Sequence, residues 1–277
     1  MSIGRRTRFD RVFDGVNILI MALIMLITLY PLYFTIIASF SDPYEVVRGN
    51  VYLFPKGFSL DAYKEVFAES RLWTGYRNSI YYTSVGVVLN LLLTIPAAYT
   101  LSKKKLPMRN IIAVYFLIPM YFSGGLIPSF LLVSQLKLMN TVWAMVLPGA
   151  ISVYNMILAR TYFRNSIPLE LLEASQMDGC NNTRFILSVV IPLSKPILAV
   201  LLLYYAVGHW NSFFNGLIYV TDSDLYPLQL ILRDILITGQ SVDPSTVDPD
   251  SLELMKQIAR TIQYGVIIVS SLPVLVL

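Results

Sequence analysis

One apolar segment near the C-terminal end holds the side chains best suited to chemistry. Residues 201–220 read LLLYYAVGHWNSFFNGLIYV and include the only histidine of the chain, His209. Phenol, imidazole and amide groups exchange hydrogen bonds, and aromatic rings offer apolar faces. Because sugar rings combine apolar C–H faces with a rim of hydroxyls, this combination suits a sugar better than an ion. We call the residues of this segment that could contact a passing solute candidate pathway residues. They are Tyr204, Tyr205, His209, Trp210, Asn211 and Asn215.

A second segment with polar side chains, residues 171–196, reads LLEASQMDGCNNTRFILSVVIPLSKP. It mixes apolar residues with Glu173 and Asp178 but contains no catalytic set. The whole chain also lacks the phosphate-binding G-x-x-x-x-G-K-[ST] pattern, H-E-x-x-H and G-x-S-x-G. A segment of this kind is typical of a docking element, and the chain has no phosphate-binding site of its own by these patterns.

The first part of this polar segment is predicted to be a short helix. Pro168 suits a first helical turn, and Glu170 and Glu173 complement the positive end of the helix dipole. We expect the helix to cover about 167–177. It should stop before Gly179, because glycine permits the left-handed conformation that ends helices.

The second part is predicted to turn back as another short helix. Asn181 or Asn182 can cap it, and it should run through about Val190. Pro192 and Pro196 then interrupt the approach to the next apolar segment. The product is a helix–turn–helix hairpin. An amphipathic linker resting on a membrane surface is the alternative interpretation.

The composition places these two groups in a membrane protein. Of 277 residues, 56% are hydrophobic and 14% are charged, and the mean hydropathy is +0.62. A spanning helix needs about 20 apolar residues. Long windows without Asp, Glu, Lys or Arg cover residues 15–41, 78–102, 110–136, 138–159 and 196–221, and a shorter one covers 261–277. We therefore predict an all-α integral membrane protein with six spans.

The distribution of positive charge predicts the orientation. Arg5, Arg6, Arg8 and Arg11 precede the first span, which places the N-terminus in the cytoplasm by the positive-inside rule. With six spans, the cytoplasmic segments have a net charge of +7 and the outer segments −3. The first window is too long, and too free of a cleavage site, for a removable signal peptide. We read it as a retained helix.

The predicted organisation is one transmembrane domain. A cytoplasmic segment 1–15 precedes a single transmembrane domain 16–277, which has outer loops at about 41–77 and 221–260 and the polar cytoplasmic loop at about 165–192. Cys180 is the single cysteine, so an intrachain disulfide and a four-cysteine metal site are excluded. No metal site is predicted.

Three residues of the third and fourth windows extend the candidate pathway. Polar groups within spans usually face a cavity or the bundle interior and are functional candidates by default. On that ground Tyr121, Tyr154 and Asn155 could face the same cavity as residues 201–220. Two other interpretations stay open: His209 could simply bond a neighbouring helix, and the tryptophan and tyrosines could be interfacial belt residues.

The polar loop resembles the EAA loop of binding-protein-dependent ABC import permeases. That pattern is Glu-Ala-Ala, three residues, Gly, nine residues, then Ile, any residue, Leu-Pro. This chain keeps Glu173, Ala174, Gly179 and Pro192 at that spacing. It departs from the pattern by small or aliphatic exchanges at Ser175, Val189 and Ile191.

The resemblance implies a coupling role for the hairpin. It would sit in a groove of a cytoplasmic ABC ATPase dimer and move as the nucleotide-bound dimer closes. ATP and Mg²⁺ would then bind the partner ATPase, and this chain would hold no cofactor. The coupling residues so implied are Glu173, Ala174, Ser175, Asp178, Gly179 and Pro192.

A second resemblance concerns the substrate. HWNSFF followed by LIYVTDSDLYPLQLILRDIL, residues 209–236, is similar to sugar-importer permeases, in particular the branch that handles complex oligosaccharides such as alginate fragments. It implies a second, homologous permease subunit and an extracytoplasmic sugar-binding protein. It also implies a bacterial cell membrane.

Together these observations favour a non-enzymatic permease subunit of an ATP-driven carbohydrate importer that works by alternating access. An ABC import permease for amino acids or peptides is the main alternative. A membrane-embedded enzyme would need convergent titratable groups within the windows, and His209 is the single candidate there. Nucleic acid is not an expected partner, because the net charge of +4 is explained by topology.

Overall fold

The regular elements of the structure, a computed structural model that describes residues 8–238 and 263–275, are all helical. The chain divides into two compact units, residues 1–69 with 234–273 and residues 70–233 with 274–277. The helices assigned to the first unit are α1 (Arg8–Ser39), α2 (Pro43–Val47) and α3 (Asp61–Ala68), with most of the helix Gln263–Leu275.

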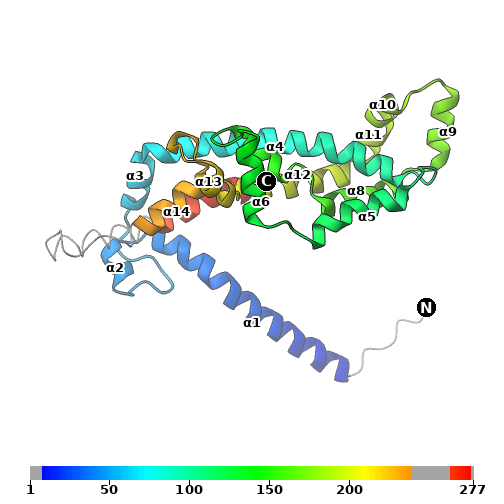
Figure 1. The fold of residues 1–277 in the computed structure, drawn as a ribbon. Helices are drawn as coiled ribbons and strands as arrows, with labels where there is room; N and C mark the ends of the chain where they lie inside the picture. The colour runs from blue at the N-terminus through cyan, green and yellow to red at the C-terminus, as the bar shows by residue number, and fades with distance from the viewer. Residues whose placement is uncertain (1–7, 239–262, 276–277) are drawn as a thin grey trace. The chain divides into compact units, whose positions relative to one another are not determined.

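Among the residues that the structure describes, helix α1 is the first of two uninterrupted helices long and apolar enough to cross a membrane. Figure 1 shows it as one long helix. Its large apolar side chains from Phe9 to Ile36 are mostly exposed. A helix that is apolar on all sides is typical of contact with lipid. This agrees with the window predicted at 15–41.

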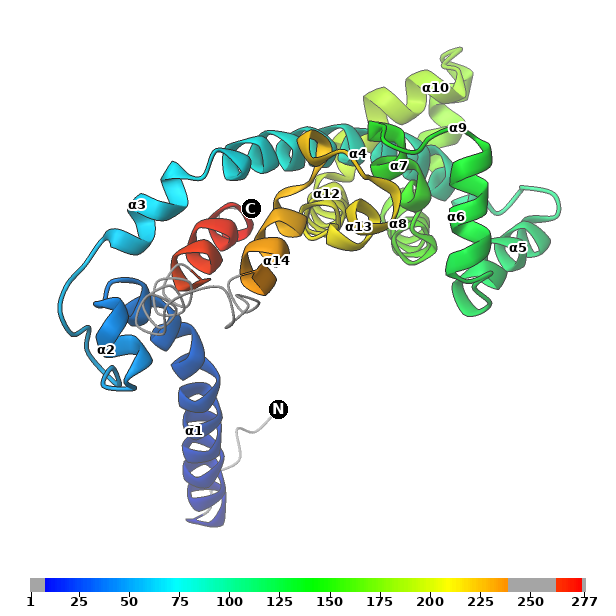
Figure 2. The ribbon, with the colours of Figure 1, turned by 60° about the vertical axis from the view of Figure 1, so that its left-hand side comes forward.

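The second unit is built around α4 (Ser70–Ser102), the other uninterrupted membrane-length helix. It packs along both α8 (Val153–Ser166) and α12 (Lys195–Trp210) (Figure 2). The buried face of α4 repeats every four residues, a spacing that places side chains on one side of a helix. The buried residues at this spacing are Asn78, Tyr82, Gly86, Asn90, Thr94 and Ala98.

The remaining membrane-length segments of this unit are bent helix pairs. The pairs bend by 109°, 54° and 88°, and up to five spans result if each pair counts as one. The pairs are α5 (Arg109–Tyr121) with α6 (Leu126–Gln135), α7 (Val142–Val146) and η1 (Leu147–Gly149) with α8, and α10 (Asn182–Phe185), η2 (Ile186–Val190) and α11 (Ile191–Leu193) with α12.

The predicted window 110–136 contains a break between Tyr121, where α5 ends, and Leu126, where α6 begins. Gly125, directly before α6, has φ +90°, a conformation that glycine adopts readily. The helix Gln263–Leu275 is shorter than a full span. Six spans thus remain a prediction.

The other elements of the second unit are short, and one crosses the boundary between the units. The hairpin helix is α9 (Leu169–Met177). After α12 come α13 (Phe213–Tyr219), the 3₁₀ turn η3 (Ser223–Leu225) and α14 (Leu228–Thr238), whose last residues belong to the first unit. Arg5, Arg6 and most of the outer loop predicted at 221–260 lie outside the described residues.

Candidate functional site

A polar cavity of about 280 Å³ lies within the second unit, between the bend of the fourth predicted span and helices α12 and α13. Its volume is close to the lower end of small-molecule sites, roughly 300 Å³. Five predicted pathway residues line it: Asn155, Tyr204, Tyr205, His209 and Asn215. Residues not predicted from the sequence complete the lining: Met145, Gly149, Ser152, Gly208 and Ser212.

Two further candidates lie at exposed positions. The ring of Tyr154, at the start of α8, lies 6.5 Å from the ring of Tyr204, centroid to centroid. Tyr154 thus adjoins the cavity without lining it. Tyr121, at the end of α5, is exposed and is not among the lining residues.

Trp210 and Asn211 instead make contacts with other parts of the helical structure. Trp210 is buried, and its ring lies 6.0 Å from that of Tyr76. The side-chain amide of Asn211 donates to the Val207 carbonyl at 3.0 Å, within the last turn of its own helix. Neither lines the cavity, although both had been predicted as pathway residues.

Behind His209, a completely buried asparagine of α4 organises the site. His209 Nε2 lies 2.7 Å from Asn90 Oδ1, and Asn90 Nδ2 donates to the carbonyls of Gly149 and Ala150 at 2.9 Å each. Those carbonyls belong to the bend before α8. Non-helical backbone within a membrane is tolerated where it is buried in protein or lines a cavity, because its polar groups then find partners.

Tyr205 makes a second link between the same elements. Its hydroxyl lies 2.7 Å from Thr94 Oγ1 and accepts the backbone N–H of Ser152 at 3.3 Å. Sequence reasoning missed Asn90 and Thr94. The signal was present, because both are polar residues in the charge-free window 78–102, four residues apart on one helical face.

The cavity is polar without being strongly charged. Its described lining contains no Asp, Glu, Lys or Arg. Across residues 8–238 and 263–275, no three His, Cys, Asp or Glu side chains gather closely enough to hold a metal ion. Hydroxyl, amide and aromatic groups are therefore what this cavity offers a ligand.

The coupling candidates lie on and after α9, which with α10 and α11 lies at one end of α4 (Figure 1). The end of α9 is a Schellman motif. Gly179 has φ +74°, its N–H donates to the Gln176 carbonyl at 3.0 Å, and the Cys180 N–H donates to the Ser175 carbonyl at 2.9 Å. The predicted stop before Gly179 agrees with this geometry.

The outer surface of α9 is exposed and mixed in character. Glu173, Ala174 and Asp178 are exposed, and so are the apolar side chains of Leu169, Leu171 and Met177, the last at 89%. Glu173 Oε1 lies 3.5 Å from Lys105 Nζ, but both side chains are largely in solvent, where such pairs contribute little. Ser175 is half-buried, and its hydroxyl donates to the Leu172 carbonyl.

The second arm begins with the predicted cap and contains one irregular turn. The Asn181 side chain accepts the Arg184 N–H at 2.8 Å. Pro192 has no N–H to donate, and the Ile191 N–H reaches back five residues to the Ile186 carbonyl in the π-helical turn η2. The arm ends at Leu193.

A second cavity, of about 480 Å³, lies between α9 and the ends of α4 and α8. Lys103, Lys104 and Arg164 contribute its basic groups, with Glu170 opposite in charge. The Lys103 ammonium donates to Asn182 Oδ1 at 2.8 Å. Burial lowers the pKa of Lys103, because the charged form loses hydration there.

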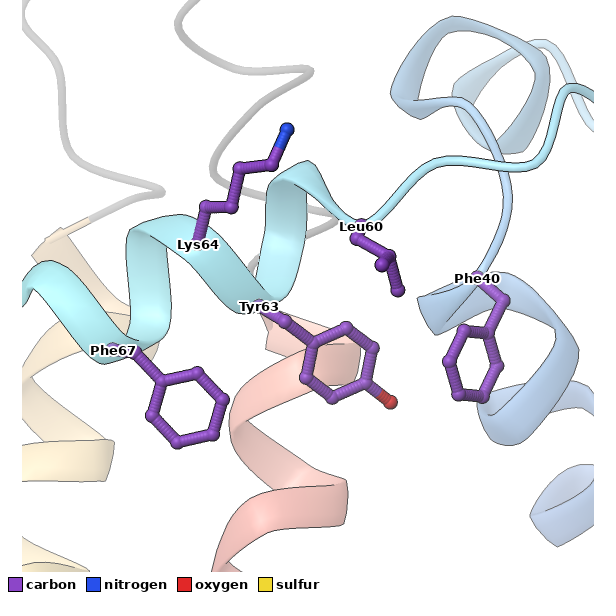
Figure 3. A pocket seen from close by; sticks show the side chains of 5 residues that line it. All are labelled: Phe40, Leu60, Tyr63, Lys64 and Phe67. Carbon is purple, nitrogen blue, oxygen red and sulfur yellow. The ribbon is translucent and has the colours of Figure 1, made fainter.

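An apolar groove belongs to the first unit, in the predicted outer segment. Its lining residues are Phe40, Leu60, Tyr63, Lys64 and Phe67. Figure 3 shows the rings of Tyr63 and Phe67 pointing to one side of α3, while the ammonium end of Lys64 points away from them. Lys64 pairs with Asp61 at 2.8 Å. Aromatic side chains of this kind are typical of a membrane–water interface.

Comparison with known proteins shows the family of the chain. Residues 72–242 match the family described as binding-protein-dependent transport system inner membrane component. Protein LplC of Bacillus subtilis (strain 168) is 37% identical over 97% of this chain and 90% of its own length. The polygalacturonan/rhamnogalacturonan transport system permease protein YtcP of the same strain is 35% identical over 96% and 92%.

A solved structure is similar along nearly the whole chain. It is the crystal structure of a bacterial ABC transporter involved in the import of the acidic polysaccharide alginate, and a chain in it is 32% identical. The similarity covers 99% of this chain and 96% of that chain, with a TM-score of 0.90. The protein therefore belongs to the family of inner membrane components of binding-protein-dependent transport systems.

Proposed function

We propose that this protein is a permease subunit of an ATP-driven oligosaccharide importer. The observation that carries the proposal is the uncharged cavity lined by Tyr204, Tyr205, His209, Asn155 and Asn215 in a chain of this family. Hydroxyls of a sugar would exchange hydrogen bonds with the amides, phenols and imidazole. Aromatic rings would pack against the sugar's C–H faces.

The relatives support carbohydrate over amino acids or peptides. Besides polygalacturonan/rhamnogalacturonan, their names include arabinooligosaccharides (30% identity over 78% of this chain), and the similar structure comes from an alginate importer. Because the described cavity lining has no cation, an acidic sugar would find its counter-charge elsewhere in the assembly. A homologous second permease is the partner we expect to supply it.

Transport would be powered by a separate ABC ATPase dimer that binds ATP and Mg²⁺. We place the hairpin of α9–α11 against this ATPase, with Glu173, Ala174, Ser175, Asp178, Gly179 and Pro192 as the coupling residues. Support comes from the exposed apolar side chains of α9 and from the tight turn at Gly179. A short, well-terminated helix transmits displacement, whereas a loose loop would absorb it.

The remaining assembly follows from this role. The chain would lie in a bacterial cell membrane with its N-terminus and the hairpin in the cytoplasm. An extracytoplasmic sugar-binding protein would deliver the substrate to the outer side. ATP binding would close the ATPase dimer, draw the hairpins together and open the cavity outward. Hydrolysis would reset the cavity.

The test is uptake by the full complex, with this permease, its second permease, the ATPase and the binding protein co-expressed and reconstituted in vesicles. Trigalacturonic acid, arabinotriose and a tripeptide serve as probes. We expect ATP-dependent accumulation of at least one oligosaccharide and none of the peptide. Accumulation of the peptide alone would replace the proposal with the amino-acid and peptide alternative.

A further inference from the structure

At the bend of the fourth predicted span, side chains of α4 and α12 bond three backbone groups. Between η1 and α8, the carbonyls of Gly149 and Ala150 and the N–H of Ser152 are bonded by side chains. The side-chain amide of Asn90 donates one hydrogen bond to each of these carbonyls, at 2.9 Å. One buried side chain of α4 therefore holds the two carbonyls of this break.

The same contacts fix which way the Asn90 amide points. A carbonyl cannot donate, so the atom facing Gly149 and Ala150 must be the NH₂ group, and both of its N–H bonds are used. The remaining oxygen, Oδ1, can only accept. His209 Nε2, 2.7 Å away, must then carry the proton. In the neutral ring this leaves Nδ1 unprotonated.

The imidazole is also held sterically by α4. Gly86, one turn before Asn90, lies so close that a Cβ at that position would be 2.3 Å from His209 Nε2. No real Cβ makes such a contact, so position 86 must lack a side chain while the ring stays there. Gly86 and Asn90 thus set both the position and the tautomer of His209.

We propose that Asn90 is a positioning residue of the sugar pathway. It does not line the cavity; it acts by tying His209 on α12 and the bend at Gly149–Ser152 into one arrangement. This inference rests on the proposed function, since it names what holds that site in shape. If the contact is lost, His209 can rotate and the cavity wall at Gly149 is no longer anchored.

Two substitutions distinguish the bond that Asn90 makes to His209 from the bonds that it makes to the two carbonyls. Asn90→Asp keeps the size and the acceptor for His209 but has no N–H for the two carbonyls. Asn90→Leu removes both. Thr83→Val on the same helix is the matched control, because the buried Thr83 hydroxyl has no partner among the described residues and does not line the cavity.

Transport kinetics of the reconstituted complex give the first readout, with the oligosaccharide that the uptake panel identifies as probe. Losing a buried hydrogen-bonding partner changes an equilibrium by roughly a factor of ten or more. We expect both Asn90 variants to raise KM about tenfold with a smaller change in Vmax, and Thr83→Val to leave both constants unchanged. His209→Gln, which offers an N–H near the position of Nε2, should retain most of the apparent affinity, whereas His209→Leu should not.

A second readout does not depend on the identity of the sugar. Ser212 lines the cavity, and its hydroxyl donates to the His209 carbonyl at 2.6 Å. In a Cys180→Ser background, the Ser212→Cys thiol reports access to the cavity through its reaction rate with a small methanethiosulfonate reagent. We expect Asn90→Leu to change this rate at least fivefold and Thr83→Val to leave it unchanged.

The two readouts distinguish failure of this inference from failure of the proposed function. Unchanged KM and an unchanged thiol rate in both Asn90 variants would overturn the positioning role. A changed thiol rate, in a protein whose wild type takes up no sugar, would sustain the role of Asn90 and overturn the oligosaccharide proposal. A loss confined to the amount of protein in the membrane, with KM retained, would reduce Asn90 to a folding residue and contradict the inference.

Discussion

Single residues have tight local geometry in two regions of this protein, the hairpin and the cavity. Gly179 is the clearest case, because its φ of +74° and its N–H bond to Gln176 are both needed to end α9. The end of α9 at Gly179 was predictable from the sequence, because the residues that end a helix lie next to one another in the chain. Which polar residues face the cavity was not, because that depends on how α4 lies against α12.

Substitutions at Gly179 should show whether the hairpin requires the left-handed backbone conformation at this position or glycine itself. A non-glycine residue in the left-handed region costs about 1–2 kcal/mol, and asparagine tolerates it best. Gly179→Pro loses the N–H and locks φ near −65°, so it cannot form the turn. We expect transport to be abolished in Gly179→Pro, reduced in Gly179→Ala and nearly retained in Gly179→Asn, with normal membrane insertion throughout. Wild-type uptake in Gly179→Pro would exclude a coupling role for this turn.

The lowered pKa of Lys103 predicts a pH dependence. The folded state binds this proton less tightly than the unfolded state, so stability rises with pH as the medium passes from the folded toward the unfolded pKa. Lys103→Gln removes that contribution. We expect the wild type to gain thermal stability relative to Lys103→Gln as the pH rises toward the unfolded pKa of about 10.5. Thermal unfolding in detergent, measured as the difference between the two proteins, is the check, and a constant difference would count against it.

At the scale of elements, charge-free windows located the helices but not their bends. All but the last two residues of 15–41 lie within the uninterrupted helix α1, and 78–102 lies within the uninterrupted helix α4. The windows 110–136 and 138–159 contain breaks. Hydropathy carries no information about which groups bond to the backbone N–H and C=O groups at a helix break. The break at Ala150–Ser152 depends on Asn90 and Tyr205, which come from elements distant in the sequence.

The link between α4 and α12 at Thr94 and Tyr205 can be measured by paired substitution. Each single change strands a buried polar partner, which costs about 1–3 kcal/mol, whereas removing both partners costs less than the sum. Tyr205→Phe should be the more destabilising single change, because the Ser152 N–H loses its acceptor as well. Thermal unfolding of Thr94→Val, Tyr205→Phe and the double variant tests this. Strictly additive losses would show that the two hydroxyls are not coupled.

At the scale of the whole molecule, the sequence was sufficient for the class of fold and for the family. The apolar windows predicted an all-helical membrane protein, and the Glu173–Pro192 spacing pointed to the family that the comparisons show. The cavity was only half predictable. Asn155, Tyr204, Tyr205, His209 and Asn215 line it, while Tyr121, Trp210 and Asn211 do not. Aromatic and amide residues can be picked out from the sequence, but helical phase and packing decide which of them face the cavity.

The central claim is that the α9 hairpin faces the cytoplasm and docks on the ATPase. Met177, 89% exposed beside Gly179, is the best reporter position on the hairpin, and Phe54, 76% exposed in the predicted outer loop, is its opposite-side control. Each is changed to cysteine in a Cys180→Ser background. A membrane-impermeant maleimide is then applied to intact cells and to inside-out vesicles, with and without the co-expressed ATPase.

We expect Met177→Cys to be labelled only in inside-out vesicles and to be protected there by the ATPase. Phe54→Cys should be labelled only in intact cells and should be indifferent to the ATPase. Labelling of Met177→Cys from outside would contradict the topology. Labelling from inside that ignores the ATPase would contradict the docking of the hairpin.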